Sequence, residues 1–157
     1  MDKPILDPCC GGKMFWFDKN NPNVLYCDNR KFAGSLCDGR SFEVSPDVIA
    51  DFTALPFDDE SFWHVVFDPP HVTNVGQSSW MAKKYGCLPK QWRPYIKTGF
   101  GECMRVLKTY GTLVFKWNEG QITAGDIIAA IGYEPLYGQK LRKNGNTLWM
   151  CFMKLPK

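Results

Sequence analysis

The sequence predicts an α/β fold built on a mostly parallel β-sheet that ends in an antiparallel hairpin. Four short apolar runs in the first 71 residues each end in an aspartate followed by turn or loop residues, a pattern typical of buried strands. Apolar residues then recur at helical spacing between Trp92 and Leu107. Finally, strand-like segments at 133–137 and 147–153 follow each other without a helix between them, which favours an antiparallel pair at a sheet edge.

The composition is that of an ordinary globular protein. The chain has 157 residues, of which 45% are hydrophobic and 22% charged, so disordered and fibrous classes are excluded. We expect a single domain over residues 1–157 without internal repeats. The first residues lack a signal-like apolar region and no long apolar run follows. We therefore expect a cytoplasmic protein without a membrane segment.

The seven cysteines do not form a metal or disulfide pattern. No pair has the two-residue gap of a zinc knuckle, and their number is odd. We expect mostly buried, reduced thiols and no metal site.

The first half of the chain supplies three strands with acids at their ends. Residues 4–6 form the first strand, which ends at Asp7 and leads into a glycine-containing turn at 8–12. Small residues there let the backbone approach a ligand closely. The second strand, 23–28, ends at Asp28, and the third, 47–52, contains Asp51 near its end.

The connections between these strands are poor in helix signals. Residues 13–17 are apolar and capable of forming a helix. Residues 29–46 carry glycines and scattered polar residues, so we expect mainly loop, with 41–44 extended. The crossover helix after the second strand should therefore be short or missing.

The fourth strand delivers Asp68-Pro69-Pro70-His71 at its end. The prolines must stop the apolar run because they cannot donate to a sheet ladder. In open α/β sheets ligands bind beyond the carboxyl ends of the strands, so Asp68 is a candidate site residue. The alternative is that Asp68 only begins a rigid turn.

The second half contains a loop, two helices and the last three strands. Residues 72–91 are predicted to be a substrate or lid loop, because they lack sustained periodicity. The helix that follows should carry Arg105 and Lys108 in its last turn. A strand over 112–117 precedes a helix that Thr123 caps and Gly132 ends.

Charge is divided unevenly along the chain. Through Asp68 there are 12 acidic and 6 basic residues, whereas the remainder has 4 acidic and 13 basic residues. Residues 69–101 contain no acid, and their lysines and arginines alternate with aromatic residues. This mixture suits phosphate neutralisation and base stacking. It is equally typical of a solvated basic face whose aromatic residues turn into the core.

Taken in order, these motifs resemble the class I S-adenosylmethionine-dependent methyltransferases, which have a Rossmann-like, seven-stranded sheet. The resemblance covers nearly the whole chain. The corresponding segments are 5–12, Asp28, 50–57, 67–71, and 102–108 followed by 111–113.

The resemblance implies that S-adenosylmethionine is the cofactor. The turn with Asp7, Pro8, Cys9 and Gly11 would cradle its methionine portion. Asp28 would bind the ribose, and Asp51 with Phe52 would hold the adenine; the alternative for Asp28 is a turn-forming role. In the family's Gly-x-Gly-x-Gly frame this chain has Cys9, Gly11 and Lys13, and Lys13 could reach the cofactor carboxylate.

The sequence Asp-Pro-Pro followed by an aromatic residue resembles the signature of methyltransferases that act on planar amino groups, including adenine N6. The resemblance implies catalytic roles for Asp68, Pro69, Pro70 and His71. A carboxylate and a backbone carbonyl that accept the two amine N–H bonds would point the nitrogen lone pair at the methyl group. His71 replaces the commoner Tyr, Phe or Trp, and stacking, proton handling and a plain turn role all remain open for it.

A nucleic acid is the substrate that the basic half favours. The candidate contacts are Trp80, Lys83, Lys84, Lys90, Arg93, Lys140, Arg142 and Lys143. The chain has no room for a separate recognition domain, so it reads a short or structured site or depends on a protein partner or a homodimer. Methylation of a small molecule or protein amide, and a catalytically degenerate nucleic-acid-binding module, are the alternatives.

Overall fold

A seven-stranded mixed sheet forms the centre of the computed structural model, with strand order β5-β2-β1-β6-β7-β9-β8. The structure describes residues 3–35, 39–73, 76, 80–139 and 146–156. The strands of this sheet are β1 Ile5–Asp7, β2 Val24–Asp28, β5 Val48–Ile49, β6 Phe62–Phe67, β7 Leu107–Asn118, β8 Tyr137–Gly138 and β9 Thr147–Met153. The strands β5, β2, β1, β6 and β7 are parallel, whereas β9 pairs antiparallel with β7 and β8. The predicted mostly parallel sheet with its C-terminal antiparallel hairpin is confirmed.

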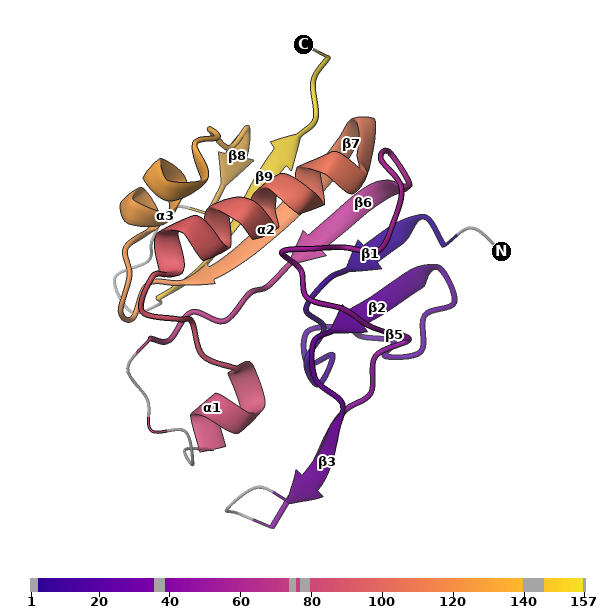
Figure 1. Cartoon of the computed structure of the whole chain (residues 1–157), viewed down its shortest axis with the longest axis vertical. Helices are drawn as coiled ribbons and strands as arrows, with labels where there is room; N and C mark the ends of the chain where they lie inside the picture. The colour runs from indigo at the N-terminus through magenta and orange to yellow at the C-terminus, as the bar shows by residue number, and fades with distance from the viewer. Residues whose placement is uncertain (1–2, 36–38, 74–75, 77–79, 140–145, 157) are drawn as a thin grey trace.

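Two helices cover one face of this sheet: α2, Trp92–Val106, and α3, Ala124–Ile131 (Figure 1). The buried side chains of α2 include Ile96, Phe100 and Cys103. They pack in one core with alternate residues of β7 such as Phe115 and Trp117. The period-2 pattern of the strand and the helical period of α2 therefore meet in a common apolar layer.

The ends of α3 follow the predicted capping chemistry. The Thr123 hydroxyl accepts a hydrogen bond from the Asp126 backbone N–H at 3.1 Å, and Gly132 ends the helix with φ 73°. By contrast, α2 ends at Val106, one residue after Arg105, and Lys108 belongs to β7. The prediction that Lys108 lies in the last helical turn was wrong, because the chain passes directly from helix to strand.

Residues 13–17 do not form the helix of which their sequence is capable. Backbone hydrogen bonds from Lys13 to Cys10 and from Trp16 to Lys13 close successive turns instead. Lys13 has φ 52°, outside the helical region. Five residues between Gly12 and Asp18 also give too few hydrogen bonds to offset helix nucleation.

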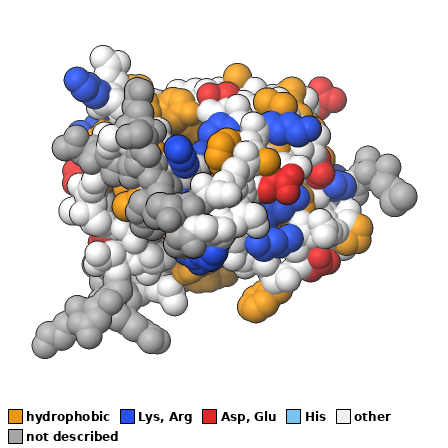
Figure 2. Space-filling view, turned by 90° about the horizontal axis from the view of Figure 1, so that it is seen from below, with side chains coloured by type: hydrophobic (Ala, Val, Ile, Leu, Met, Phe, Trp, Pro, Cys, Tyr) orange, Lys and Arg blue, Asp and Glu red, His pale blue; other side chains and the backbone are white. Residues whose placement is uncertain are grey.

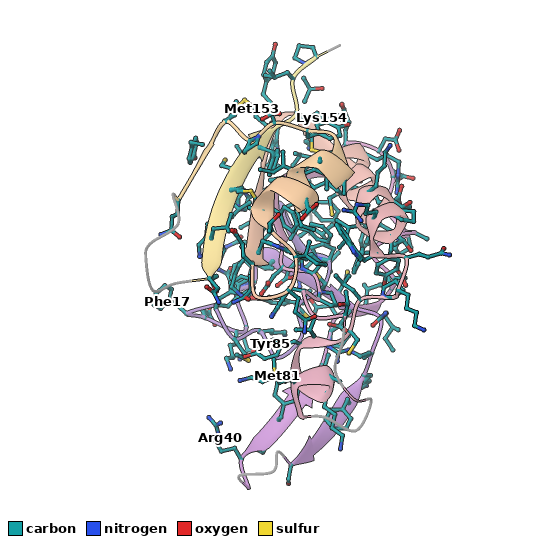
Figure 3. The ribbon with its side chains drawn as sticks, turned by 90° about the vertical axis from the view of Figure 1, so that its left-hand side faces the viewer. Phe17, Arg40, Met81, Tyr85, Met153 and Lys154 are labelled. Carbon is teal, nitrogen blue, oxygen red and sulfur yellow. The ribbon has the colours of Figure 1, made fainter. Side chains whose placement is uncertain are left out.

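A two-stranded hairpin, β3 Phe32–Ser35 with β4 Ser41–Val44, replaces the crossover helix between β2 and β5. It projects from the body of the molecule, and Arg40 lies on it (Figures 1 and 3). The extended segment at 41–44 and the missing helix are confirmed. The partner strand β3 was not predicted, since all four of its residues are exposed and show no alternation.

The predicted loop at 72–91 contains a short helix, α1, Trp80–Tyr85. It was not predicted because one and a half turns are too short to establish an apolar period. The predicted strands at 47–52 and 133–137 are reduced to Val48–Ile49 and Tyr137–Gly138. Among the helices of the described residues, none combines the length and apolarity needed to cross a bilayer.

The packing of α2 against the sheet can be tested at Gly99. A Cβ atom at this position would overlap the Phe52 ring, and Phe52 is itself confined by Phe67 and Tyr95, with ring centroids 5.2 Å and 4.9 Å away. Gly99→Ala should therefore lower the free energy of unfolding by about 1–3 kcal/mol in chemical denaturation.

Gly101→Ala provides the matched control on the same helix. Among the described residues, no heavy atom beyond the adjoining helix backbone lies within 4 Å of a Cβ at Gly101, so this substitution should stabilise the protein by about 0.5–1 kcal/mol through helix propensity. Equal effects of the two substitutions would contradict the close contact at Gly99.

Candidate functional site

The buried side chain of Asp7 fixes the turn after β1. This carboxyl group is fully buried and accepts hydrogen bonds from Trp16 Nε1 at 2.8 Å and from the Cys9 backbone N–H at 3.3 Å. Burial raises the pKa of Asp7 to about 7, although the bonds from Trp16 and Cys9 act in the opposite direction. Asp7 therefore organises the turn and does not itself line the cavity above it.

The same turn is tied to the end of β2. The Gly11 backbone N–H donates to Asp28 Oδ2 at 2.9 Å, and Cys10 N–H donates to the Cys27 carbonyl at 2.7 Å. Gly11 has φ 47°, a conformation that glycine adopts without steric cost. Asp28 therefore bonds to the turn, as the turn-forming alternative predicts. It also lines the cavity.

Arg30 is a site residue that sequence reasoning missed. Its backbone N–H and Nε donate to Asp28 Oδ1 at 3.0 and 3.1 Å, and its Nη1 donates to the Lys83 carbonyl at 2.9 Å. It therefore connects the end of β2 with α1. The contact spans 53 residues, and no local pattern could have revealed it.

Asp68 lies at the tip of β6 and forms an ion pair with Lys116 of β7. Lys116 Nζ is 2.7 Å from Asp68 Oδ2. Burial raises the pKa of Asp68, and the Lys116 ammonium counteracts this effect. Lys116 also lies 5.3 Å from the Phe15 ring centroid and 5.8 Å from that of Trp149. Such aromatic faces stabilise an ammonium group.

His71 is packed between aromatic rings. Its ring centroid is 5.7 Å from that of Tyr85 and 6.4 Å from that of Trp117. Burial lowers the pKa of His71 and Lys116 adds to this effect, whereas Asp68 opposes it. The imidazole is consequently mostly neutral near pH 7. Tyr85, which belongs to α1, was not predicted as a site residue.

The Cys9 thiol occupies a position where the family frame has glycine. Burial raises its pKa well above the usual value, and Asp7 and Asp68 add to the effect. Cys9 is therefore a neutral thiol and a poor nucleophile at neutral pH. Elsewhere among the described cysteines, Cys10, Cys27, Cys103 and Cys151 are buried free thiols, in agreement with the prediction.

A cavity of about 310 Å³ lies over the ends of β1, β2 and β6. It brings together nine of the predicted site residues. These are Pro8, Cys9, Gly11, Asp28, Phe52, Asp68, Pro69, Pro70 and His71. Arg30, Lys84, Tyr85, Tyr95 and Lys116 complete much of its remaining wall.

Two further predicted residues point elsewhere. Asp51 Oδ1 accepts hydrogen bonds from the Thr53 backbone N–H at 2.8 Å and from its hydroxyl at 2.7 Å. Asp51 does not line the cavity, but its Oδ2 lies 3.5 Å from the hydroxyl of Tyr95, which does. Lys13 Nζ lies 4.0 Å from the centroid of the Tyr26 ring, also outside the cavity lining.

A second cavity of about 470 Å³ adjoins the first. Asp68, His71, Tyr85 and Lys116 line both cavities. The wall belonging to the second cavity alone is formed by Val72, Met81, Asn118, Gly120, Gln121 and Thr147. Met81 and Tyr85 come from α1, on the side toward the projecting hairpin (Figure 3).

The predicted nucleic-acid contacts are only partly placed. Lys84 lines the first cavity, and Lys83, Lys90 and Arg93 are exposed. Arg93 pairs with Asp126 at 3.1 Å. Trp80 begins α1, but its side chain, like Lys140, Arg142 and Lys143, lies outside the described residues. Lys and Arg side chains occur among hydrophobic ones on the face viewed from the α1 end of the molecule (Figure 2).

No protein-family model and no curated protein matches the sequence, but solved structures match the fold. A SAM-dependent methyltransferase from Methanosarcina mazei superposes with a TM-score of 0.61 at 14% identity, covering 98% of this chain and 92% of the other.

Two other methyltransferase structures cover 99% of this chain. An rRNA methylase from Streptococcus thermophilus has a TM-score of 0.55 at 11% identity, with 89% of its own chain covered. A putative methyltransferase from Haloferax volcanii, solved with the activator Trm112, has a TM-score of 0.56 at 11% identity, with 84% covered. The chain thus has the fold of class I methyltransferases.

The buried Asp7 carboxyl group generates a pH-dependent stability. Its pKa is about 7 in the folded protein, against 3.8 when unperturbed. Between these values the unfolded chain releases a proton that the folded chain retains, so stability falls as pH rises and levels off above about pH 7.

Asp7→Asn should remove this decline. From about pH 5 to pH 7, its free energy of unfolding should rise by roughly 2 kcal/mol relative to that of the parent. Asp47→Asn serves as control because the pKa of Asp47 is lowered. Burial raises this pKa, but the bonds from Lys3 and from the Tyr26 N–H, together with the nearby lysine charges, outweigh burial. Its profile should run parallel to the parent's in this window, and a parallel profile for Asp7→Asn would refute the assignment.

Proposed function

We propose that the protein is an S-adenosylmethionine-dependent methyltransferase that modifies an exocyclic amino group of a nucleic-acid base, adenine N6. The observation that carries this proposal is the position of Asp68-Pro69-Pro70-His71. Asp68 and His71 line both cavities at the point where they meet. A cofactor in the first cavity and an acceptor in the second would share this strand tip.

The first cavity fits the proposed cofactor in its chemistry. Gly11 lines the cavity and has a positive φ, so the backbone of the turn at 8–12 lies close to the cavity. Asp28 and Asp68 provide negative charge suited to a sulfonium or ammonium group, and Arg30 and Lys84 provide positive charge suited to a carboxylate. Phe52 and Tyr95 supply aromatic surface for a purine. S-adenosylmethionine, when bound, supplies an electrophilic methyl group.

Asp68 and the prolines position the acceptor nitrogen. The lone pair of an exocyclic amine is delocalised into its ring, which makes the amine a weak nucleophile. Hydrogen bonds from the amine to the Asp68 carboxylate and the Pro69 carbonyl favour a more tetrahedral nitrogen. Lys116 favours the ionised form of Asp68, which is the form that accepts such bonds.

The nucleic-acid substrate is supported by the charge around the cavities. Lys84 lies at the first cavity, and Lys83 and Lys90 are exposed nearby in sequence. These cations suit phosphate neutralisation.

Substitution of Asp68 tests the mechanism. Labelled methyl transfer to random-sequence DNA and RNA libraries should fall by roughly 100-fold or more in Asp68→Ala, because the amine loses its charged acceptor. The exposed loop substitution Asp58→Ala should leave transfer unchanged. Transfer at the parent rate by Asp68→Ala would refute the mechanism, and failure of the folded parent to bind S-adenosylmethionine in calorimetry would refute the enzyme.

The role of His71 can be separated by two substitutions. If the imidazole stacks on the acceptor, His71→Phe should retain kcat/KM within about 10-fold, whereas His71→Ala should lose about 10- to 100-fold. If His71 takes up the proton, both variants should lose activity and the pH–rate profile should lose one limb. Two variants as active as the parent would show that His71 is only a turn residue.

A further inference from the structure

The polar side chains that line the second cavity include charged groups and carboxamides. Besides the Asp68–Lys116 pair, the described residues of the lining include the carboxamides of Asn118 and Gln121. The Asn118 Oδ1 accepts from the Gly120 backbone N–H at 2.9 Å. The Gln121 Oε1 accepts from the Thr73 backbone N–H at 2.7 Å.

These bonds fix which end of each amide is available. A backbone N–H can bond only to an acceptor, so each side chain must turn its oxygen toward the backbone and its nitrogen away from it. One hydrogen of Asn118 Nδ2 is used by Thr147 Oγ1 at 3.1 Å. Within the described part of the chain, the Gln121 Nε2 group has no hydrogen-bond partner. Gln121 thus offers a donor at the edge of the cavity.

The Gln121 side chain is also fixed relative to the catalytic strand tip. Thr73 follows His71 by two residues, and both its backbone N–H and its hydroxyl, at 3.1 Å, bond to Gln121 Oε1. These bonds join the segment after Asp68 to the loop after β7. The donor therefore keeps a set position with respect to Asp68, as a group that reads a bound ring requires.

We propose that the second cavity binds the acceptor base and that the Gln121 side-chain nitrogen donates to a ring nitrogen next to the reacting amine. The inference rests on the proposed function and deepens it. An amine donor at Asp68 beside a ring acceptor at Gln121 matches adenine, whose N6 is flanked by N1 and N7, and cytosine, whose N4 adjoins N3. The N2 amine of guanine lies between an N1–H donor and N3, so only N3 could accept a hydrogen bond from Gln121. Gln121 is thereby a specificity-determining residue.

The first experiment identifies the labelled nucleoside. Random-sequence DNA and RNA libraries are methylated with labelled cofactor and digested, and the nucleosides are separated. Label in N6-methyladenine supports both the inference and the proposed function. Label in N4-methylcytosine supports the inference but refutes adenine as the target. Label in protein alone, or in no fraction despite cofactor binding, overturns the inference.

The second experiment tests the contact itself with modified substrates. An oligonucleotide from the methylated pool is prepared with adenine, 1-deazaadenine or 7-deazaadenine at the target. Gln121→Ala should lower kcat/KM on adenine by about 10-fold. On the analogue that lacks the recognised nitrogen, parent and variant should be equally slow, because that contact is already absent.

Controls separate this contact from other defects. Gln121 does not line the first cavity, so the Kd for S-adenosylmethionine should be unchanged in Gln121→Ala. Gln139→Ala, an exposed glutamine next to β8 and outside both cavities, should behave as the parent on all three substrates. A loss in Gln121→Ala that is equal on all three substrates, or no loss at all, overturns the inference.

Discussion

The buried Asp7 carboxyl group is the constraint on which the site depends. It is fully buried and held by N–H groups of Cys9 and Trp16, so it joins the turn at 8–12 to the aromatic segment that follows. That segment carries Phe15 against Trp149, with ring centroids 5.6 Å apart, and beside the Lys116 ammonium. One carboxyl group therefore fixes both the floor of the first cavity and the surroundings of the cation that pairs with Asp68.

The two cavities divide the proposed chemistry between them. The first is lined by backbone turns, opposite charges and aromatic rings, whereas the lining of the second includes the Asp68–Lys116 pair and the carboxamides of Asn118 and Gln121. The Asp68–Lys116 pair belongs to both, so its charge balance affects both ligands. Lys116 Nζ lies 2.7 Å from Asp68 Oδ2, so an incoming amine would share this carboxylate with the ammonium group. Carboxylate oxygens can accept more than one bond, which permits both partners.

Features encoded by neighbouring residues could be predicted from the sequence, and those made by distant residues could not. The strand ends that place 8–12 and 68–71 were predicted because each apolar run stops at an acid and a turn. The Asp51 carboxylate does not line the first cavity as predicted, because it accepts hydrogen bonds from the nearby Thr53. Lys116, Arg30 and Gln121 were missed because their partners lie 48 or more residues away in sequence. Side chains of β7 alternate between the two faces of the sheet, so the sequence places Lys116 only on the face away from α2 and α3.

The turns that replace a helix after β1 have a consequence for local opening. A helix protects its amides cooperatively, whereas the bonds from Lys13 to Cys10, Trp16 to Lys13, and Asn21 to Asp18 close separate turns and can break one at a time. Hydrogen exchange should therefore be faster in this wall of the first cavity than in the buried strands β1 and β6. Ligand binding in the cavity would slow hydrogen exchange in this wall and leave the exchange rates of the sheet unchanged.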